Sequence, residues 1–197
     1  MAEAAPGIGK ERLAAFSDGV IAVIITIMVL ELHPPHEATA AALLELIHPF
    51  FAYVLSFIYV GIYWNNHHHM FQAVERVNGR VLWANNFLLF TLSLVPFATA
   101  WMGDTDFALV PTIAYGVTMF LPGAAYFLLA RELVKLHGPN SMLAQAMGAG
   151  VKEWLSLVFY AAGIAGAFIH PYVAFGFYMA VAVMWFVPDR RIERRLS

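Results

Sequence analysis

Residues 12–32 read RLAAFSDGVIAVIITIMVLEL, a short polar motif that leads into a long apolar stretch. From Phe16 to Leu32, the only ionisable side chains are those of Asp18 and Glu31. A helix of ~17–20 mostly apolar residues is long enough to cross the ~30 Å hydrocarbon core of a bilayer. The stretch is therefore predicted to be a transmembrane helix, which makes the chain a membrane protein.

The composition of the whole chain supports the same class. Of its 197 residues, 61% are hydrophobic and 12% are charged, whereas soluble globular domains average ~45–50% and ~25%. These values exclude a disordered chain and argue against a soluble enzyme. Cysteine is absent, which excludes disulfides and Cys-ligated metal centres, and the net charge of −2 gives no indication of nucleic-acid binding.

Five further segments resemble the first in length and apolar character. The predicted fold is an all-α membrane protein with six transmembrane helices, at Phe16–Leu32, Leu43–Trp64, Val81–Met102, Phe107–Ala130, Trp154–His170 and Pro171–Val187. The last two form a hairpin, because proline disfavours helix in the residue before it and is tolerated in the first turn of the next helix. Small residues around Gly163 and Gly166 predict close packing of the fifth segment, which we assign to assembly. Without a linker or internal repeat, residues 1–197 are predicted to form a single domain.

The eleven basic residues are confined to alternate loops and to the two ends of the chain. They are Lys10, Arg12, Arg76, Arg80, Arg131, Lys135, Lys152, Arg190, Arg191, Arg194 and Arg195. Because Lys and Arg near segment ends are retained on the cytoplasmic side, both termini are predicted to be cytoplasmic, which agrees with an even number of spans. The first segment lacks a small-residue cleavage site, so we expect it to remain in the mature protein.

Asp18 is the residue of the first segment that most requires a partner. An ionised carboxylate in an apolar membrane helix is costly unless it is paired or hydrated. Arg12 or a polar group from another predicted helix could supply that partner; the polar candidates are His67, His68, His69, Asn85 and Asn86. Alternatively, the carboxylate is stabilised by the positive end of the helix dipole and has no further role.

The spacing around Asp18 carries a family resemblance. Arg12, Phe16, Ser17, Asp18 and Gly19 read R-x-x-x-F-S-D-G immediately before the apolar helix. This pattern resembles the signature of the transmembrane protein 175 family, the endolysosomal potassium channels and their bacterial relatives. Further similar positions are Trp64, His67, His68, His69, Phe71, Asn85, Asn86, Pro96, Phe97 and Thr99.

The resemblance implies a channel of the short bacterial type. With a single copy of the motif, the chain looks like the family members that assemble as homotetramers, whereas the animal proteins carry two such units per chain. The resemblance implies a cation pore lined by the first helix of each subunit, which favours potassium modestly over sodium. It also implies a location in a bacterial plasma membrane.

Helical geometry identifies the face of the first helix that could line such a pore. The residues within about 60° of Val23, at ~100° per residue, are Phe16, Gly19, Thr26, Ile27 and Leu30. Ser17 and Asp18 lie about 120° and 140° from Val23. We therefore expect these two polar residues to hold the helix against its neighbours rather than to touch permeating ions. Alternatively, the apolar stripe is an ordinary lipid or helix contact.

The resemblance places apolar constrictions at Val23, Ile27 and Leu30. Rings of apolar side chains can gate a pore by dewetting, because they offer an ion no replacement for its hydration shell. Thr26 carries the only hydroxyl on the stripe and is the candidate for potassium selectivity. The chain has no T-V-G-Y-G filter and no Arg-rich helix, so carbonyl-based selectivity and voltage sensing are not predicted. Glu31 either enriches cations at the mouth or is an ordinary solvated carboxylate.

The histidine triplet suggests a polar network rather than a metal site. Adjacent helical residues point about 100° apart, so His67, His68 and His69 cannot all reach one ion. We predict that one or two of them hydrogen-bond to Ser17 or Asp18, with Asn85 and Asn86 completing the network. No cofactor is expected besides the permeant K⁺.

Two other functions remain open at this stage. A secondary transporter would be expected to show broken helices or inverted repeats around a midplane site, and neither is evident. A structural membrane subunit would form no conductance. An intramembrane enzyme would require convergent nucleophiles or a metal motif such as H-E-x-x-H, which the chain lacks.

Overall fold

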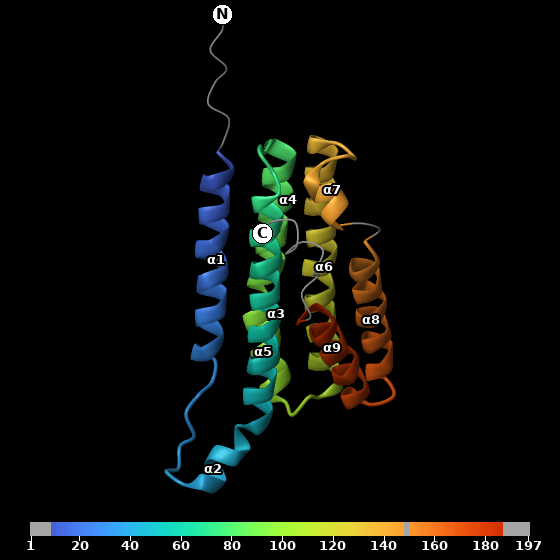
Figure 1. Ribbon diagram of the computed structural model, residues 1–197. Helices are drawn as coiled ribbons and strands as arrows, with labels where there is room; N and C mark the ends of the chain where they lie inside the picture. Colours follow the sequence, from blue (N-terminus) through green and yellow to red (C-terminus); the bar gives the residue numbers. More distant parts are fainter. Residues whose placement is uncertain (1–8, 148–149, 187–197) are drawn as a thin grey trace, which may run out of the picture.

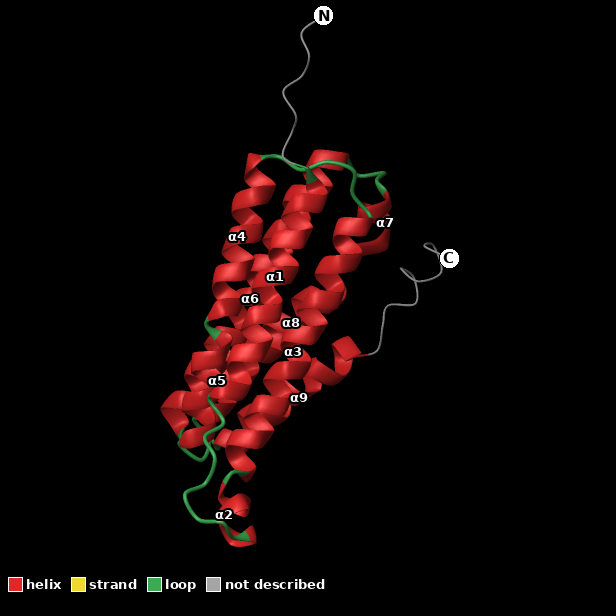
Figure 2. Ribbon diagram, turned by 90° about the vertical axis from the view of Figure 1, so that its left-hand side faces the viewer, coloured by secondary structure: helices red, strands yellow, loops and turns green. Residues whose placement is uncertain are grey.

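The computed structural model describes residues 9–147 and 150–186. This part of the chain is helical, with no strand, and its helices are joined by short connections (Figures 1 and 2). The helices are α1 (Lys10–Leu30), α2 (Ala40–Glu45), α3 (Ile47–Gln72), α4 (Gly79–Ser93), α5 (Val95–Asp104), α6 (Leu109–His137), α7 (Met142–Met147), α8 (Val151–Ala167) and α9 (Pro171–Phe186). The predicted all-α class is confirmed.

Within residues 9–147 and 150–186, four helical stretches are long and apolar enough to cross a membrane. They are Lys10–Leu30, Ile47–Gln72, Gly79–Asp104 and Leu109–His137. The third combines α4 and α5, which are separated only at Leu94, just before Pro96 in the first turn of α5. Helices α8 and α9 have 17 and 16 residues and form the predicted hairpin, broken before Pro171. The chain is therefore a multi-pass membrane protein, and the count of six spans stays a prediction. Val187, the predicted end of the last segment, lies outside the described residues.

The second predicted segment is displaced in the structure. Leu43 belongs to the short helix α2, and α3 continues to Gln72 instead of ending at Trp64. Hydropathy falls after Trp64 because the chain becomes polar there. The helix continues because part of this polar stretch is buried between helices, including His67 at 1% exposure.

The helices pack as one bundle with α1 at its edge. Helix α1 contacts α3, α4 and α5, and α6 joins this group to the α8–α9 hairpin. Tyr178 of α9 fills the space left by two glycines: a Cβ atom on Gly116 would lie 2.0 Å from its hydroxyl oxygen, and one on Gly163 would lie 2.6 Å from its ring. The small-residue face of the fifth predicted segment therefore serves packing within the hairpin of one chain.

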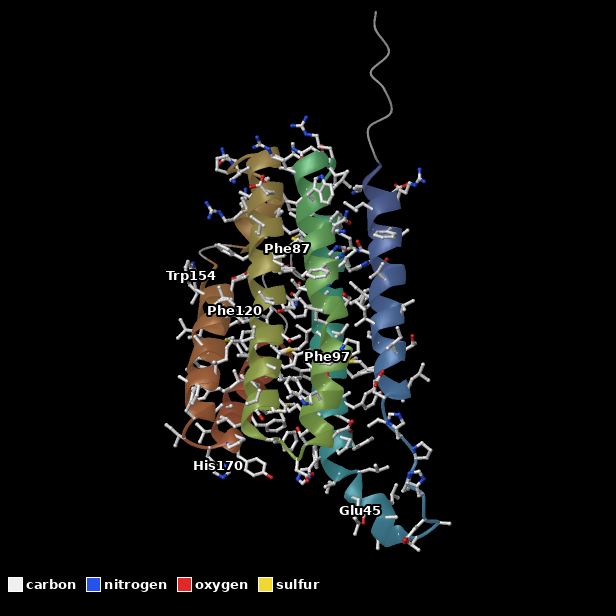
Figure 3. All side chains as sticks on the ribbon, turned by 180° about the vertical axis from the view of Figure 1, so that it is seen from behind. Glu45, Phe87, Phe97, Phe120, Trp154 and His170 are labelled. Atoms are coloured by element: carbon white, nitrogen blue, oxygen red, sulfur yellow. The ribbon has the colours of Figure 1, made fainter. Side chains whose placement is uncertain are left out.

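Charge divides the bundle into a basic end and an acidic end. The basic end gathers the start of α1, the α3–α4 loop and the last turns of α6. Lys10 Nζ donates to the Val74 carbonyl at 2.7 Å, and Arg76 donates to the Leu136 carbonyl at 3.3 Å. Glu31, Asp104 and the labelled Glu45 lie toward the opposite end (Figure 3). The basic residues 190–195 lie outside the described part of the chain, and the cytoplasmic assignment of the basic end stays a prediction.

Candidate pore-lining site

One face of α1 is buried against the rest of the subunit. The buried residues recur at intervals of three or four and are Leu13, Ser17, Ile21, Ile24 and Met28. This spacing keeps them on a single side of the helix. They face α3 and α4, so the side of α1 that carries Ser17 is fixed within the subunit.

The opposite face of α1 is the predicted stripe, and the part of the chain that the structure describes leaves it uncovered. Phe16 is 56% exposed, Val23 54%, Ile27 40% and Leu30 73%. Gly19 and Thr26 are also exposed. The helical-wheel division of α1 into an inward polar side and an outward apolar side therefore matches the burial of its residues.

A groove of about 1060 Å³ runs between this stripe and α5. The stripe contributes Phe16, Gly19, Val23 and Ile27, and the facing wall includes Phe97, labelled in Figure 3, and Trp101. Glu31 and Asp104 line the groove toward its acidic end. The groove is otherwise mostly apolar. An uncovered apolar surface of this size is typical of a site that contacts another protein or the membrane.

A directed hydrogen-bond chain anchors the buried side of α1. His67 Nε2 lies 2.8 Å from Asn85 Oδ1, Asn85 Nδ2 donates to Ser17 Oγ at 2.9 Å, and Ser17 Oγ donates to the Leu13 carbonyl at 2.9 Å. Because Asn85 Oδ1 can only accept, the proton of His67 is on Nε2. His67, Asn85 and Ser17 are each at most 1% exposed. These hydrogen bonds thus connect α3, α4 and α1 through buried atoms.

This geometry corrects one predicted contact. We expected a histidine to bond directly to Ser17 or Asp18, but among the described residues His67 reaches Ser17 only through Asn85. The amide is suited to this position because it both accepts and donates.

Asp18 has a partner that the sequence did not indicate. Its Oδ1 atom accepts a hydrogen bond from Trp64 Nε1 at 2.9 Å, and the Trp64 ring stacks on His68 with centroids 5.7 Å apart. The sequence places Trp64 only at the end of a predicted segment and among the positions similar to the family. Its position three residues before His67 on the same helix is the available signal, since residues spaced by three share a helical face.

The remaining predicted network residues lie elsewhere. His68 bonds to Gln72 of its own helix at 2.8 Å, and His69 Nδ1 is buried with no hydrogen-bond partner among the described residues. Asn86 and Arg12 are exposed. Within the described residues, no group of three or more His, Cys, Asp or Glu side chains could hold a metal ion. Of the five polar candidates from α3 and α4, only His67 and Asn85 take part in the buried hydrogen-bond chain that reaches Ser17.

Comparison with known proteins places this arrangement in a family. A family model described as the endosomal/lysosomal potassium channel TMEM175 matches residues 12–96. A potassium channel of Chryseobacterium sp. (strain P1-3) is 52% identical over 188 residues, which cover 95% of this chain and 98% of that protein. The chain belongs to the TMEM175 family. The matched range begins at Arg12 of the motif and encloses Trp64, His67 and Asn85.

Other TMEM175 relatives agree in sequence and in fold. A potassium channel of Streptomyces collinus (strain DSM 40733 / Tue 365) is 35% identical over 97 residues, which cover 47% of each chain. The crystal structure of a lysosomal potassium-selective channel TMEM175 homolog from Chamaesiphon minutus matches with a TM-score of 0.79 at 26% identity, over 90% of this chain and 96% of that chain. TMEM175 proteins are ion channels, so the prediction that the chain is not an enzyme is confirmed.

Proposed function

We propose that this chain is a potassium-favouring cation channel whose pore is lined by the exposed stripe of α1 from four identical subunits. The observation that carries the proposal is the two-sidedness of α1: its polar motif is buried within the subunit, while Val23, Ile27 and Leu30 remain uncovered. The potassium channels named among its relatives support the choice of ion.

A multimer is required because one helix cannot enclose a passage. The uncovered stripe and the groove beside it leave a large apolar surface for neighbouring subunits and the pore. Four copies of α1 around a central axis would turn each stripe residue into a ring of four side chains. Rings at Val23, Ile27 and Leu30 would form an apolar constriction that passes ions only when it widens and hydrates.

Thr26 is oriented to assist a cation on this stripe. Its Oγ1 atom lies 3.0 Å from the carbonyl oxygens of both Ala22 and Val23, one turn earlier in α1. The hydroxyl proton is therefore donated to the helix backbone, which leaves the oxygen lone pairs available for a cation. Four such oxygens would replace part of the hydration shell of K⁺ and would give modest selectivity over Na⁺.

Several further features belong to the same proposal. We place residues 1–197 in a single channel domain of a bacterial plasma membrane, with both termini cytoplasmic and with no cofactor besides the permeant ion. A secondary transporter remains the alternative, and solute counterflow distinguishes it, because a transporter exchanges solute with saturation. A structural subunit would show no ion flux at all.

The test is ion flux in liposomes under opposed K⁺ and Na⁺ gradients. We expect K⁺ flux from the wild-type protein, and a several-fold increase for Val23→Ala because the ring would be wider and wetter. Val158→Ala is the matched control, since Val158 of α8 is 56% exposed against 54% for Val23. Unchanged flux for Val23→Ala and Leu30→Ala, with incorporation verified, would remove the stripe as the gate. Absence of any wild-type flux would contradict the channel itself.

A further inference from the structure

A second groove lies on another side of the bundle, between α4 and α6. It encloses about 540 Å³ and is lined by Gly79, Arg80, Trp83, Ala84, Phe87, Leu128 and Glu132. Its size falls within the ~300–1,000 Å³ of typical ligand sites. None of these residues belongs to the α1 stripe or to the hydrogen-bond chain that anchors it. We call this space the α4–α6 groove.

The wall of the groove changes from charged to apolar along α4. Arg80, Trp83 and Phe87 are spaced by three and four residues, so they follow one another on a single face of the helix. Trp83 is 77% exposed and Phe87, labelled in Figure 3, is 43% exposed. Leu128 of α6, also 43% exposed, adds to the apolar wall. The wall passes from a charged residue, through an indole suited to the membrane interface, to apolar side chains. A lipid has the same order of headgroup, interfacial region and acyl chain.

The charged part of the groove has an excess of cations. Lys135, Arg80 and Arg131 all lie close enough to attract the Glu132 carboxylate, which bonds to Lys135 Nζ at 2.5 Å. Arg131 also lies over the Phe127 ring, on the neighbouring face of α6. One carboxylate among three cations leaves a positive local charge, and Glu132 is already paired. A phosphate group therefore suits this end of the groove.

We propose that the α4–α6 groove binds an anionic phospholipid. The phosphodiester lies at Arg80, at the basic end of the bundle, and one acyl chain runs along Trp83, Phe87 and Leu128. Basic pockets between membrane helices bind anionic headgroups in this way. The proposal is independent of the channel function, because it concerns which lipid is retained and not which ion passes.

Native mass spectrometry of protein extracted from vesicles of equal parts phosphatidylglycerol and phosphatidylcholine tests the site. We expect the wild-type protein to retain phosphatidylglycerol preferentially, and Arg80→Gln to reduce that preference about fivefold, as expected for one cation near the surface. Arg80→Lys should keep most of it, which guards against a folding defect. Trp83→Ala should lower retention of both lipids, because it removes part of the acyl-chain wall.

Arg76→Gln is the matched control. Arg76 lies at the same end of the bundle, but its guanidinium bonds to the Leu136 carbonyl and does not line the groove. An equal loss of preference in Arg76→Gln and Arg80→Gln would mean that only the general surface charge attracts lipid, and would overturn the proposal. So would a Trp83→Ala protein that changes its oligomeric mass while keeping its lipids, because a neighbouring subunit would then cover the groove.

Discussion

The two faces of α1 differ in their contacts with the rest of the chain. The inward face is fixed by a buried hydrogen-bond chain through Ser17 and by apolar packing, whereas the outward face carries Phe16, Val23 and Leu30 with more than half of each side chain exposed. The polar motif therefore acts as the attachment of the helix to its own subunit. Because the polar side is used internally, the apolar side is left for the proposed pore.

The largest expected effect comes from removing the centre of the hydrogen-bond chain. Asn85→Leu leaves the buried His67 Nε2–H group without its acceptor, whereas Ser17 Oγ loses one donor but keeps its own bond to the Leu13 carbonyl. Each orphaned buried group costs ~1–3 kcal/mol in soluble proteins, and interhelical hydrogen bonds in membranes contribute ~0.6–1.7 kcal/mol. We expect the free energy of unfolding in detergent to fall by roughly 1–3 kcal/mol.

Asn86→Leu is the matched control for that experiment. Asn86 is the adjacent residue and is exposed, so its replacement should change the unfolding free energy by less than about 0.5 kcal/mol. If the two variants unfold alike, the buried chain does not fix α1 and the comparison between its two faces fails.

Asp18 should give the next largest effect. Asp18→Ala removes the acceptor of the Trp64 indole, a partly exposed bond, so we expect a loss of roughly 0.5–1.5 kcal/mol. Less assembled protein should be recovered, while the K⁺/Na⁺ flux ratio of the recovered channels stays constant. Trp64→Phe removes the same hydrogen bond. Combining it with Asp18→Ala should therefore lower the unfolding free energy little further than Asp18→Ala alone. A fully assembled Asp18→Ala channel with an altered flux ratio would instead place Asp18 in the pore.

The smallest effect is expected on the outward face, and on selectivity alone. Thr26→Val keeps the shape of the side chain but removes the oxygen, so the K⁺/Na⁺ flux ratio should fall a few-fold without loss of stability. Thr105→Val is the control, since Thr105 also donates to its own helix, at 2.6 Å from the Trp101 carbonyl, but does not line the stripe. An unchanged ratio in Thr26→Val would remove Thr26 as the selectivity residue.

Hydropathy and periodicity predicted much of the fold. The apolar stretches, the hairpin broken before Pro171 and the outward stripe around Val23 all follow from properties that act within one helix. Their limit is visible at α3, where the polar residues after Trp64 ended the predicted segment although the helix continues to Gln72. The helix continues there because His67 is buried between helices, and a hydropathy profile contains no information about such burial.

The partners of the motif could be predicted only in part. His67 and Asn85 were expected to approach helix α1. The sequence did not predict that Asn85 contacts Ser17 directly while His67 contacts Asn85. The Asp18–Trp64 bond joins residues 46 positions apart, and the Ser17–Asn85 bond joins residues 68 apart. Such pairs depend on how three helices cross, which a single sequence does not encode in any local pattern.

The sequence by itself therefore determined that this chain is a membrane protein, where most of its apolar helical stretches occur, and that α1 has a polar and an apolar side. These follow from the cost of transferring side chains into lipid and from the 3.6-residue helical repeat. Only the tertiary structure decided that Asn85 links His67 to Ser17, that Trp64 is the partner of Asp18, and that a groove lies between α4 and α6. Those features arise where separate helices meet, and their geometry is set by packing.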